Sequence, residues 1–112
     1  MTYYTIQNSN KGTLNISAFV ISNIAQETLE ELANDSLKGS ISLKLARKRK
    51  NIEVVIEHNK VVVNVFFSAL RNSDVQKSVL AIQNGIYDAL NELTEISTIK
   101  VNVSVVSFVD NE

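Results

Sequence analysis

Apolar and polar residues alternate in two rhythms along this chain. Apolar residues spaced by three and four positions, the period of an amphipathic helix, follow Ser17 and again follow Ser73. Strict one-to-one alternation, which is typical of a strand buried on one face, fills much of the remaining sequence. The pattern therefore predicts two helices and several strands.

The first predicted helix runs from Ser17 to about Asn34. Ser17 is a good N-cap, because its hydroxyl accepts a hydrogen bond from the exposed amides of the first turn. The helix should end near Asn34, since Asn34, Asp35 and Ser36 favour a turn and Gly39 follows. The apolar stripe of this helix consists of Ile21, Ile24, Ala25, Leu29, Leu32 and Ala33.

The second predicted helix starts at a capping box formed by Ser73 and Gln76. In this motif the Ser73 hydroxyl accepts from the amide of Gln76, and the Gln76 side chain reaches back to the amide of Ser73. The apolar stripe of this helix consists of Val75, Val79, Ile82, Ile86, Ala89, Leu90 and Leu93.

Five segments alternate as strands do: residues 13–16, 41–45, 52–56, 61–67 and 98–109. The middle three are expected to form a meander. A tight hairpin turn at residues 57–60 joins two of them, with Asn59 best suited to a positive φ. We expect an α+β fold of order β-α-β-β-β-α-β, with two helices on one face of a mainly antiparallel sheet. Residues 1–11 are expected to be a tail or short edge strand, and residues 12–112 a single domain.

Composition narrows the classes of function. The chain has 112 residues, of which 45% are apolar and 21% charged, and its net charge is −1. Sequence-independent binding of nucleic acid needs a basic excess that this balance lacks. The absence of cysteine excludes disulfides, thiolate zinc sites and a cysteine nucleophile. The start has no signal-peptide pattern and no apolar run is long enough to span a membrane, so we expect a cytoplasmic location.

Residues suited to catalysis or metal binding are few. His58 is the only histidine; it lies in the predicted turn, and only Glu57 stands beside it. Glu27, Glu30 and Glu31 occupy the polar side of the first helix, where a solvated acidic face is expected. The three glycines are too far apart to form a phosphate-binding loop. We therefore expect no catalytic residues, no cofactor, no metal site and no small-molecule substrate.

Four consecutive cations, Arg47, Lys48, Arg49 and Lys50, form a predicted turn between two strands. Such a turn can bind an anion, whether a lipid head group, RNA or an acidic protein surface. The alternative is a solvated turn whose charges oppose edge-to-edge aggregation of the sheet.

The sheet face turned away from the helices is the second candidate site. Alternation places five apolar residues on it among polar ones: Val55, Val62, Phe66, Val106 and Phe108. No remaining element is left to cover them, and exposed apolar patches tend to mark association sites. The alternative is that Tyr3, Tyr4 and Ile6 fold back over this face.

Several motifs occur in a particular order. Gly12 and a short strand precede an Ile-rich helix, residues 81–84 read Ala-Ile-Gln-Asn, residues 90–94 read Leu-Asn-Glu-Leu-Thr, and residues 99–105 read Ile-Lys-Val-Asn-Val-Ser-Val. From Gly12 to about Val109 this order resembles the alkaline shock protein family of bacterial envelope-stress proteins. The chain departs from the family in two loops. Residues 68–72 replace a usual Tyr-Gly step, and Glu95 stands where a Gly usually follows the threonine.

The resemblance implies a non-enzymatic, often abundant stress-response protein linked to the cell envelope. Some family members are tethered at the membrane by a separate anchor protein, and some self-assemble. With the apolar face, this predicts an interaction or scaffold protein that acts as a homo-oligomer or by binding a protein partner. The alternative is a small nucleic-acid-binding module that uses the basic turn and the exposed aromatic residues of the sheet.

Overall fold

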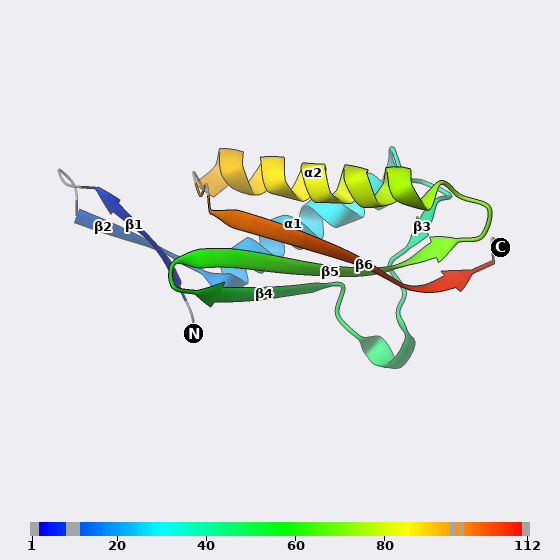
Figure 1. Cartoon of the computed structure of the whole chain (residues 1–112), viewed down its shortest axis with the longest axis horizontal. Coiled ribbons are helices and arrows are strands. Elements are labelled where there is room, and N and C mark those ends of the chain that lie inside the picture. The colour runs from blue at the N-terminus through cyan, green and yellow to red at the C-terminus, as the bar shows by residue number, and fades with distance from the viewer. Residues whose placement is uncertain (1–2, 9–11, 95, 97, 111–112) are drawn as a thin grey trace.

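The computed structural model describes residues 3–8, 12–94, 96 and 98–110. Two helices, α1 (Ala18–Asn34) and α2 (Val75–Thr94), lie on one face of a four-stranded sheet, and within the described residues the other face carries no α-helix (Figure 1). The predicted α+β class, with two helices on one face of a mainly antiparallel sheet, is confirmed. The order β-α-β-β-β-α-β is confirmed as well, with one further strand ahead of it.

A separate two-stranded sheet precedes α1. β1 (Tyr3–Asn8) pairs antiparallel with β2 (Gly12–Ser17), and this hairpin extends beyond one end of the four-stranded sheet (Figure 1). The side chain of Asn59 links the two sheets. Its Nδ2 donates to the Thr5 carbonyl at 3.1 Å, and its Oδ1 accepts from the Thr5 amide at 3.0 Å.

β5 (Lys60–Leu70) is the central strand of the main sheet. One edge of β5 pairs antiparallel with β4 (Ile52–Glu57) and, further along, with the short β3 (Ile41–Ser42). The other edge pairs in parallel with β6 (Ile99–Val109). The two long strands are parallel because α2 returns the chain to the starting end of β5 before β6 begins.

The three middle strands do not form the expected meander. β3 pairs with β5 and not with β4, and the strand predicted at residues 41–45 is reduced to Ile41 and Ser42. The chain then leaves the sheet for a loop with one 3-10 turn, Ala46–Lys48. Arg47 and Lys48 in this loop have φ values of 60° and 55°, which strand geometry does not allow.

His58 and Asn59 form the turn between β4 and β5. Both have positive φ, 49° and 57°, as a type I′ turn requires. The twist of this turn matches the twist of the two strands it connects, so the pairing of β4 with β5 starts at the turn without a loop. The expected hairpin and the positive φ at Asn59 are confirmed, and His58 is an exposed residue of the turn.

The two helices begin at different kinds of cap. The Ser17 hydroxyl accepts from the Val20 amide at 3.2 Å, as expected for α1. The capping box predicted for α2 is wrong, because the Ser73 hydroxyl donates to the Leu70 carbonyl at 2.6 Å. Asp74 caps the helix in its place, with Oδ1 accepting from the Lys77 amide at 3.1 Å.

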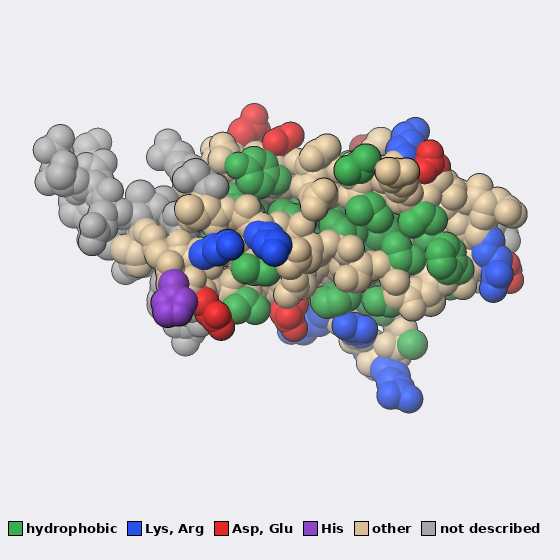
Figure 2. Space-filling model, in the orientation of Figure 1, with side chains coloured by type: hydrophobic (Ala, Val, Ile, Leu, Met, Phe, Trp, Pro, Cys, Tyr) green, Lys and Arg blue, Asp and Glu red, His purple; other side chains and the backbone are tan. Residues whose placement is uncertain are grey.

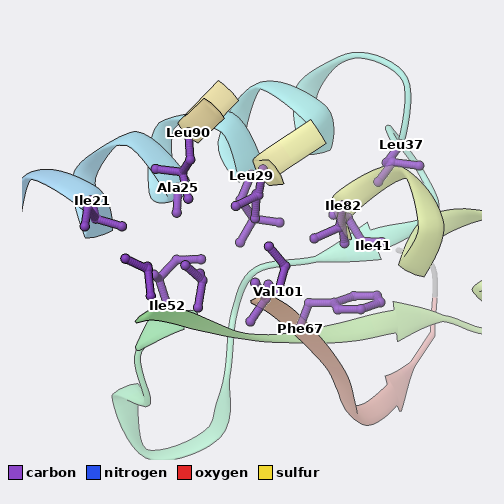
Figure 3. Close-up of a cluster of buried hydrophobic side chains, with 14 of the residues drawn as sticks. Ile21, Ala25, Leu29, Leu37, Ile41, Ile52, Phe67, Ile82, Leu90 and Val101 are labelled. Carbon is purple, nitrogen blue, oxygen red and sulfur yellow. The ribbon is translucent and has the colours of Figure 1, made fainter. Parts of the chain in front are cut away.

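The core lies between the helix pair and the sheet. Figure 3 shows side chains from α1, such as Ile21 and Leu29, pointing toward those of the strands, such as Ile52 and Phe67. The stripe predicted for α1 faces this core, and Ile21, Ala25 and Leu29 are completely buried. On α2 the buried positions recur every fourth residue: Ser78, Ile82, Ile86, Leu90 and Thr94. This spacing leaves Leu93, which was predicted to be buried, 70% exposed at the end of the helix.

Candidate interaction surface

A polar rung crosses the helix-free face of the sheet. The Asn64 Nδ2 on β5 donates to the Glu53 Oε1 on β4 at 3.0 Å, and the Asn64 Oδ1 accepts from the Asn102 Nδ2 on β6 at 3.1 Å. The three residues are neighbours in the pairing register of the strands. The rung therefore separates the apolar residues predicted for this face into two groups.

Val55 and Val62 form the first group. They are a cross-strand pair of β4 and β5, and Val62 has Lys100 as its neighbour on β6. Val62 is half-buried and Val55 is 36% exposed. A valine pair beside a charged side chain is an ordinary solvated part of a sheet.

Phe66 lies on the other side of the rung and is half-buried. The guanidinium of Arg49 covers its ring, with Cζ 4.1 Å from the ring centroid. The expectation that no element covers this face is therefore wrong at Phe66, because the loop before β4 folds onto it. This contact between Arg49 and Phe66 brings together the two sites predicted from the sequence, the turn with four cations and the apolar face of the sheet.

Asn51 fixes the basic loop, the segment of residues 43–51 that carries the four cations, to the sheet. Its Nδ2 donates to the carbonyls of Leu43 and Phe66, each at 2.9 Å. The side chains of the four cations, residues 47–50, are exposed. Arg49 and Lys50 also line an open groove of 410 Å³ between the start of α1 and β4, together with Phe19 and other residues. The groove contains both cations and the carboxylate of Glu53, so its charge is mixed.

A register shift changes the predicted position of Phe108. Phe67 pairs with Val105, but Ser68 pairs with Ser107, so Val106 is an extra residue in β6. The Ser68 and Ser107 hydroxyls lie 2.7 Å apart, which shows that these two side chains share the helix-free face. Alternation then moves Phe108 to the helix side, in register with Ala69 of the core.

Val106, the extra residue at the register shift, stays exposed on the side of the sheet that faces the basic loop. It is 39% exposed and lines a hollow of 480 Å³ together with Leu45, Arg47 and Arg49 of the basic loop. Phe108, on the other side of the sheet, is 55% exposed near the end of β6. The five residues predicted as one patch therefore lie in three places: beside Lys100, under the basic loop, and on the helix side of β6.

The outer edge of β6 is a feature that no sequence pattern indicates. The Thr98 carbonyl accepts from the Val61 amide of β5, so the main-chain groups of the next residue point away from β5. Consistent with this alternation, the Val101 carbonyl accepts from the Gln83 Nε2 of α2 at 3.0 Å and not from β5. The amides and carbonyls of Val103 and Val105 point to the same side, and within the described residues no strand pairs with that edge.

α2 presents apolar side chains above this edge. Leu80 and Tyr87 stand three residues before and four residues after Gln83, so all three share the flank of the helix that faces β6. Leu80 is 48% exposed and Tyr87 is 38% exposed. Figure 2 shows hydrophobic side chains gathered between α2 and the second half of β6. We name Leu80, Tyr87, Val103, Val105 and Phe108 the β6 edge surface.

His58 and the three glutamates considered for catalysis lie on different elements of the structure. His58 is in the β4–β5 turn, and Glu27, Glu30 and Glu31 are on the exposed side of α1, where Glu30 accepts from Gln26 at 3.2 Å. Within residues 3–8, 12–94, 96 and 98–110, no three His, Cys, Asp or Glu residues are grouped so as to hold a metal ion.

Comparisons of the chain with protein-family models, with curated proteins and with solved structures gave no match. In the described part of the chain, neither helix combines the length and the apolar character needed to cross a membrane.

Proposed function

We propose that this chain works by binding protein, through self-association or through a protein partner, and not by catalysing a reaction. The observation that carries the proposal is the β6 edge surface, where Phe108, Leu80 and Tyr87 are 55%, 48% and 38% exposed beside an unpaired strand edge. Exposed apolar side chains grouped around a strand edge are typical of surfaces that bind another chain.

The resemblance to the alkaline shock proteins supports a setting for this activity. We place the protein in the cytoplasm, at the inner face of the membrane, held there by a partner that is itself anchored and acting in the envelope stress response. The sequence features that carry this setting are residues 81–84, 90–94 and 99–105.

Site-specific photocrosslinking in the organism that makes the protein tests the proposal. One variant carries benzoylphenylalanine in place of Phe108, and a matched control carries it in place of Phe19, an aromatic residue of α1 that is 65% exposed. We expect a discrete protein adduct from position 108 that is absent from position 19. The adduct should disappear when Leu80 on the same surface is changed to lysine. Equal adducts at both positions, or none at either, would rule out this surface as the binding site.

A further inference from the structure

We infer that the partner of the β6 edge surface is a second copy of this chain, with the two β6 strands pairing antiparallel into one continuous sheet. This inference rests on the proposed function and names its partner. It starts from the free edge, where the amides and carbonyls of Val103 and Val105 have no strand beside them within the described residues. Only an extended strand satisfies donors and acceptors in that alternating order.

The edge lacks most of the devices by which proteins prevent such pairing. Strand edges are usually protected by proline, by several charged side chains or by an early bulge. The chain has no proline, and from Val101 to Val109 β6 has no charged residue. The register shift comes late, after Val105, so the strand is straight from Ile99 to Val105. The Val101 carbonyl bonds Gln83, and the outward groups of Val103 and Val105 follow it along the edge.

The uncharged centre of β6 favours a copy of the same strand. Lys100 stands near its start and Asp110 directly after its end. In an antiparallel pair the Lys100 end of one strand lies beside the Asp110 end of the other, where Asp110 is already paired with Arg71 of its own chain at 2.9 Å, so no like charges meet at either end. A two-fold interface places each central residue near its own equivalent, and an uncharged centre avoids repulsion there.

The flank of α2 fits the same arrangement. A two-fold axis perpendicular to the sheet keeps all helices on one face and places the two α2 helices next to each other. Because α2 runs opposite to β6 and Gln83 bonds the Val101 carbonyl, Leu80 lies nearer than Tyr87 to an axis at Ser104. The exposed side chain of Leu80 therefore approaches the α2 helix of the second copy. In the simplest register Val103 exchanges main-chain hydrogen bonds with Val105 of the second copy, and Val105 does so with Val103.

The test measures assembly and strand pairing on the purified full chain. Sedimentation velocity across a concentration series gives the oligomeric state, and NMR hydrogen exchange reports the amides of Val103 and Val105. We expect a dimer in which both amides become protected as the concentration rises. A dimer whose Val103 and Val105 amides exchange freely at all concentrations would overturn this interface.

Matched variants make the test specific. The amide of Val103 points away from β5, so Val103→Pro removes a donor of the free edge without breaking a bond to β5, whereas Val103→Ala keeps the donor and also shortens the side chain. We expect Val103→Pro to raise the dimer Kd by about tenfold or more and Val103→Ala to raise it much less. Leu80 is 48% exposed, so we expect Leu80→Lys to leave folding intact and to raise the dimer Kd by a similar factor.

The result separates this inference from the proposed function. A chain that stays monomeric at millimolar concentration overturns the second copy as partner. The crosslinking experiment then decides on the proposed function independently, because an adduct between position 108 and a different protein would keep it. If neither a dimer nor an adduct forms, both are wrong.

Discussion

The guanidinium of Arg49 lies over the ring of Phe66, with its Cζ 4.1 Å from the ring centroid. This contact joins the basic loop to the helix-free face of the sheet. Asn51, at the end of the loop, holds it there, because its Nδ2 donates to the Leu43 carbonyl before the loop and to the Phe66 carbonyl of β5. The aromatic face that was expected to be open to a partner is therefore already occupied by a residue of the same chain.

The first prediction concerns the strength of this contact. Arg49→Ala should lower the free energy of unfolding by about 0.5–1 kcal/mol, because a cation over an aromatic ring at an exposed site is worth about that much. Lys50→Ala is the control, since Lys50 is a neighbouring exposed cation. Urea denaturation followed by circular dichroism measures both. Equal effects of the two substitutions would show that the ring contact adds nothing in solution.

Helix capping gives a second prediction, on which the sequence and the structure disagree. Asp74→Ala should cost about 1 kcal/mol of stability, because it removes the acceptor of the Lys77 amide at the start of α2. Asp74→Asn, which retains an oxygen acceptor, should cost clearly less. Ser73→Ala removes only a hydroxyl that donates to the Leu70 carbonyl. If Ser73→Ala proved more destabilising than Asp74→Ala in urea denaturation, Asp74 would not be the main cap of α2.

The two caps show which local features can be predicted from this sequence. The prediction of Ser17 as the N-cap of α1 is confirmed, because its hydroxyl directly precedes the helical apolar spacing. At the start of α2 two adjacent residues, Ser73 and Asp74, both suit an N-cap, and the choice depends on where the preceding strand ends. The Leu70 carbonyl attracts the Ser73 hydroxyl, a contact that no sequence pattern reveals.

The same distinction applies to the candidate site. Alternation placed Val55, Val62 and Phe66 on the correct face, because β5 has no irregularity there. It failed at Phe108, because one extra residue in β6 reverses the alternation, and that shift depends on pairing with β5. The β6 edge was missed since an unpaired edge is a property of strand order. Leu80 and Tyr87 did carry a signal: they are apolar, seven residues apart, and outside the predicted stripe.

Gly85 provides a third prediction, on the packing of the two helices. A Cβ at this position would lie 3.2 Å from the Leu32 Cδ1 and 3.7 Å from the Thr28 Cγ2 of α1. Leu32 is only half-buried, so its methyl group can shift by the few tenths of an ångström required. Alanine gains about 1 kcal/mol of helix propensity over glycine, and we expect Gly85→Ala to be stabilising by somewhat less.

The matched variant for this position is Gly85→Val, which places two more methyl groups against the same side chains. Overpacking of this kind costs about 1–3 kcal/mol, so we expect a lower midpoint of thermal unfolding for valine and a higher one for alanine. A lower midpoint for Gly85→Ala would mean that Leu32 is held more firmly than its exposure indicates.

A fourth prediction concerns the attachment of the N-terminal hairpin. Asn59→Gly keeps the turn, since glycine readily adopts its φ of 57°, but removes both side-chain hydrogen bonds to Thr5. We expect faster hydrogen exchange of the Thr5 amide in NMR and little change at the core amides of β5. His58→Gly, at the other turn position, is the control and should leave Thr5 unchanged. Unaltered exchange of Thr5 in Asn59→Gly would show that other contacts hold β1 in place.

The last prediction addresses nucleic-acid binding, the alternative to a protein-binding role. Stacking of bases on the sheet requires open aromatic faces, and Arg49 covers the ring of Phe66. The four cations of the loop, in a chain of net charge −1, supply few phosphate contacts. We therefore expect no binding of single-stranded RNA at about 0.15 M salt, where exposed charges are strongly screened, and no change when residues 47–50 are all replaced by glutamine.

Fluorescence anisotropy with labelled RNA over a salt series measures this binding, with vesicles of anionic lipid as a parallel probe of the same cations. RNA affinity that falls steeply with salt and is lost in the glutamine variant would favour the nucleic-acid module. Binding to vesicles alone would make the basic loop a lipid contact, which is compatible with protein binding at β6 because the two surfaces lie on different parts of the sheet.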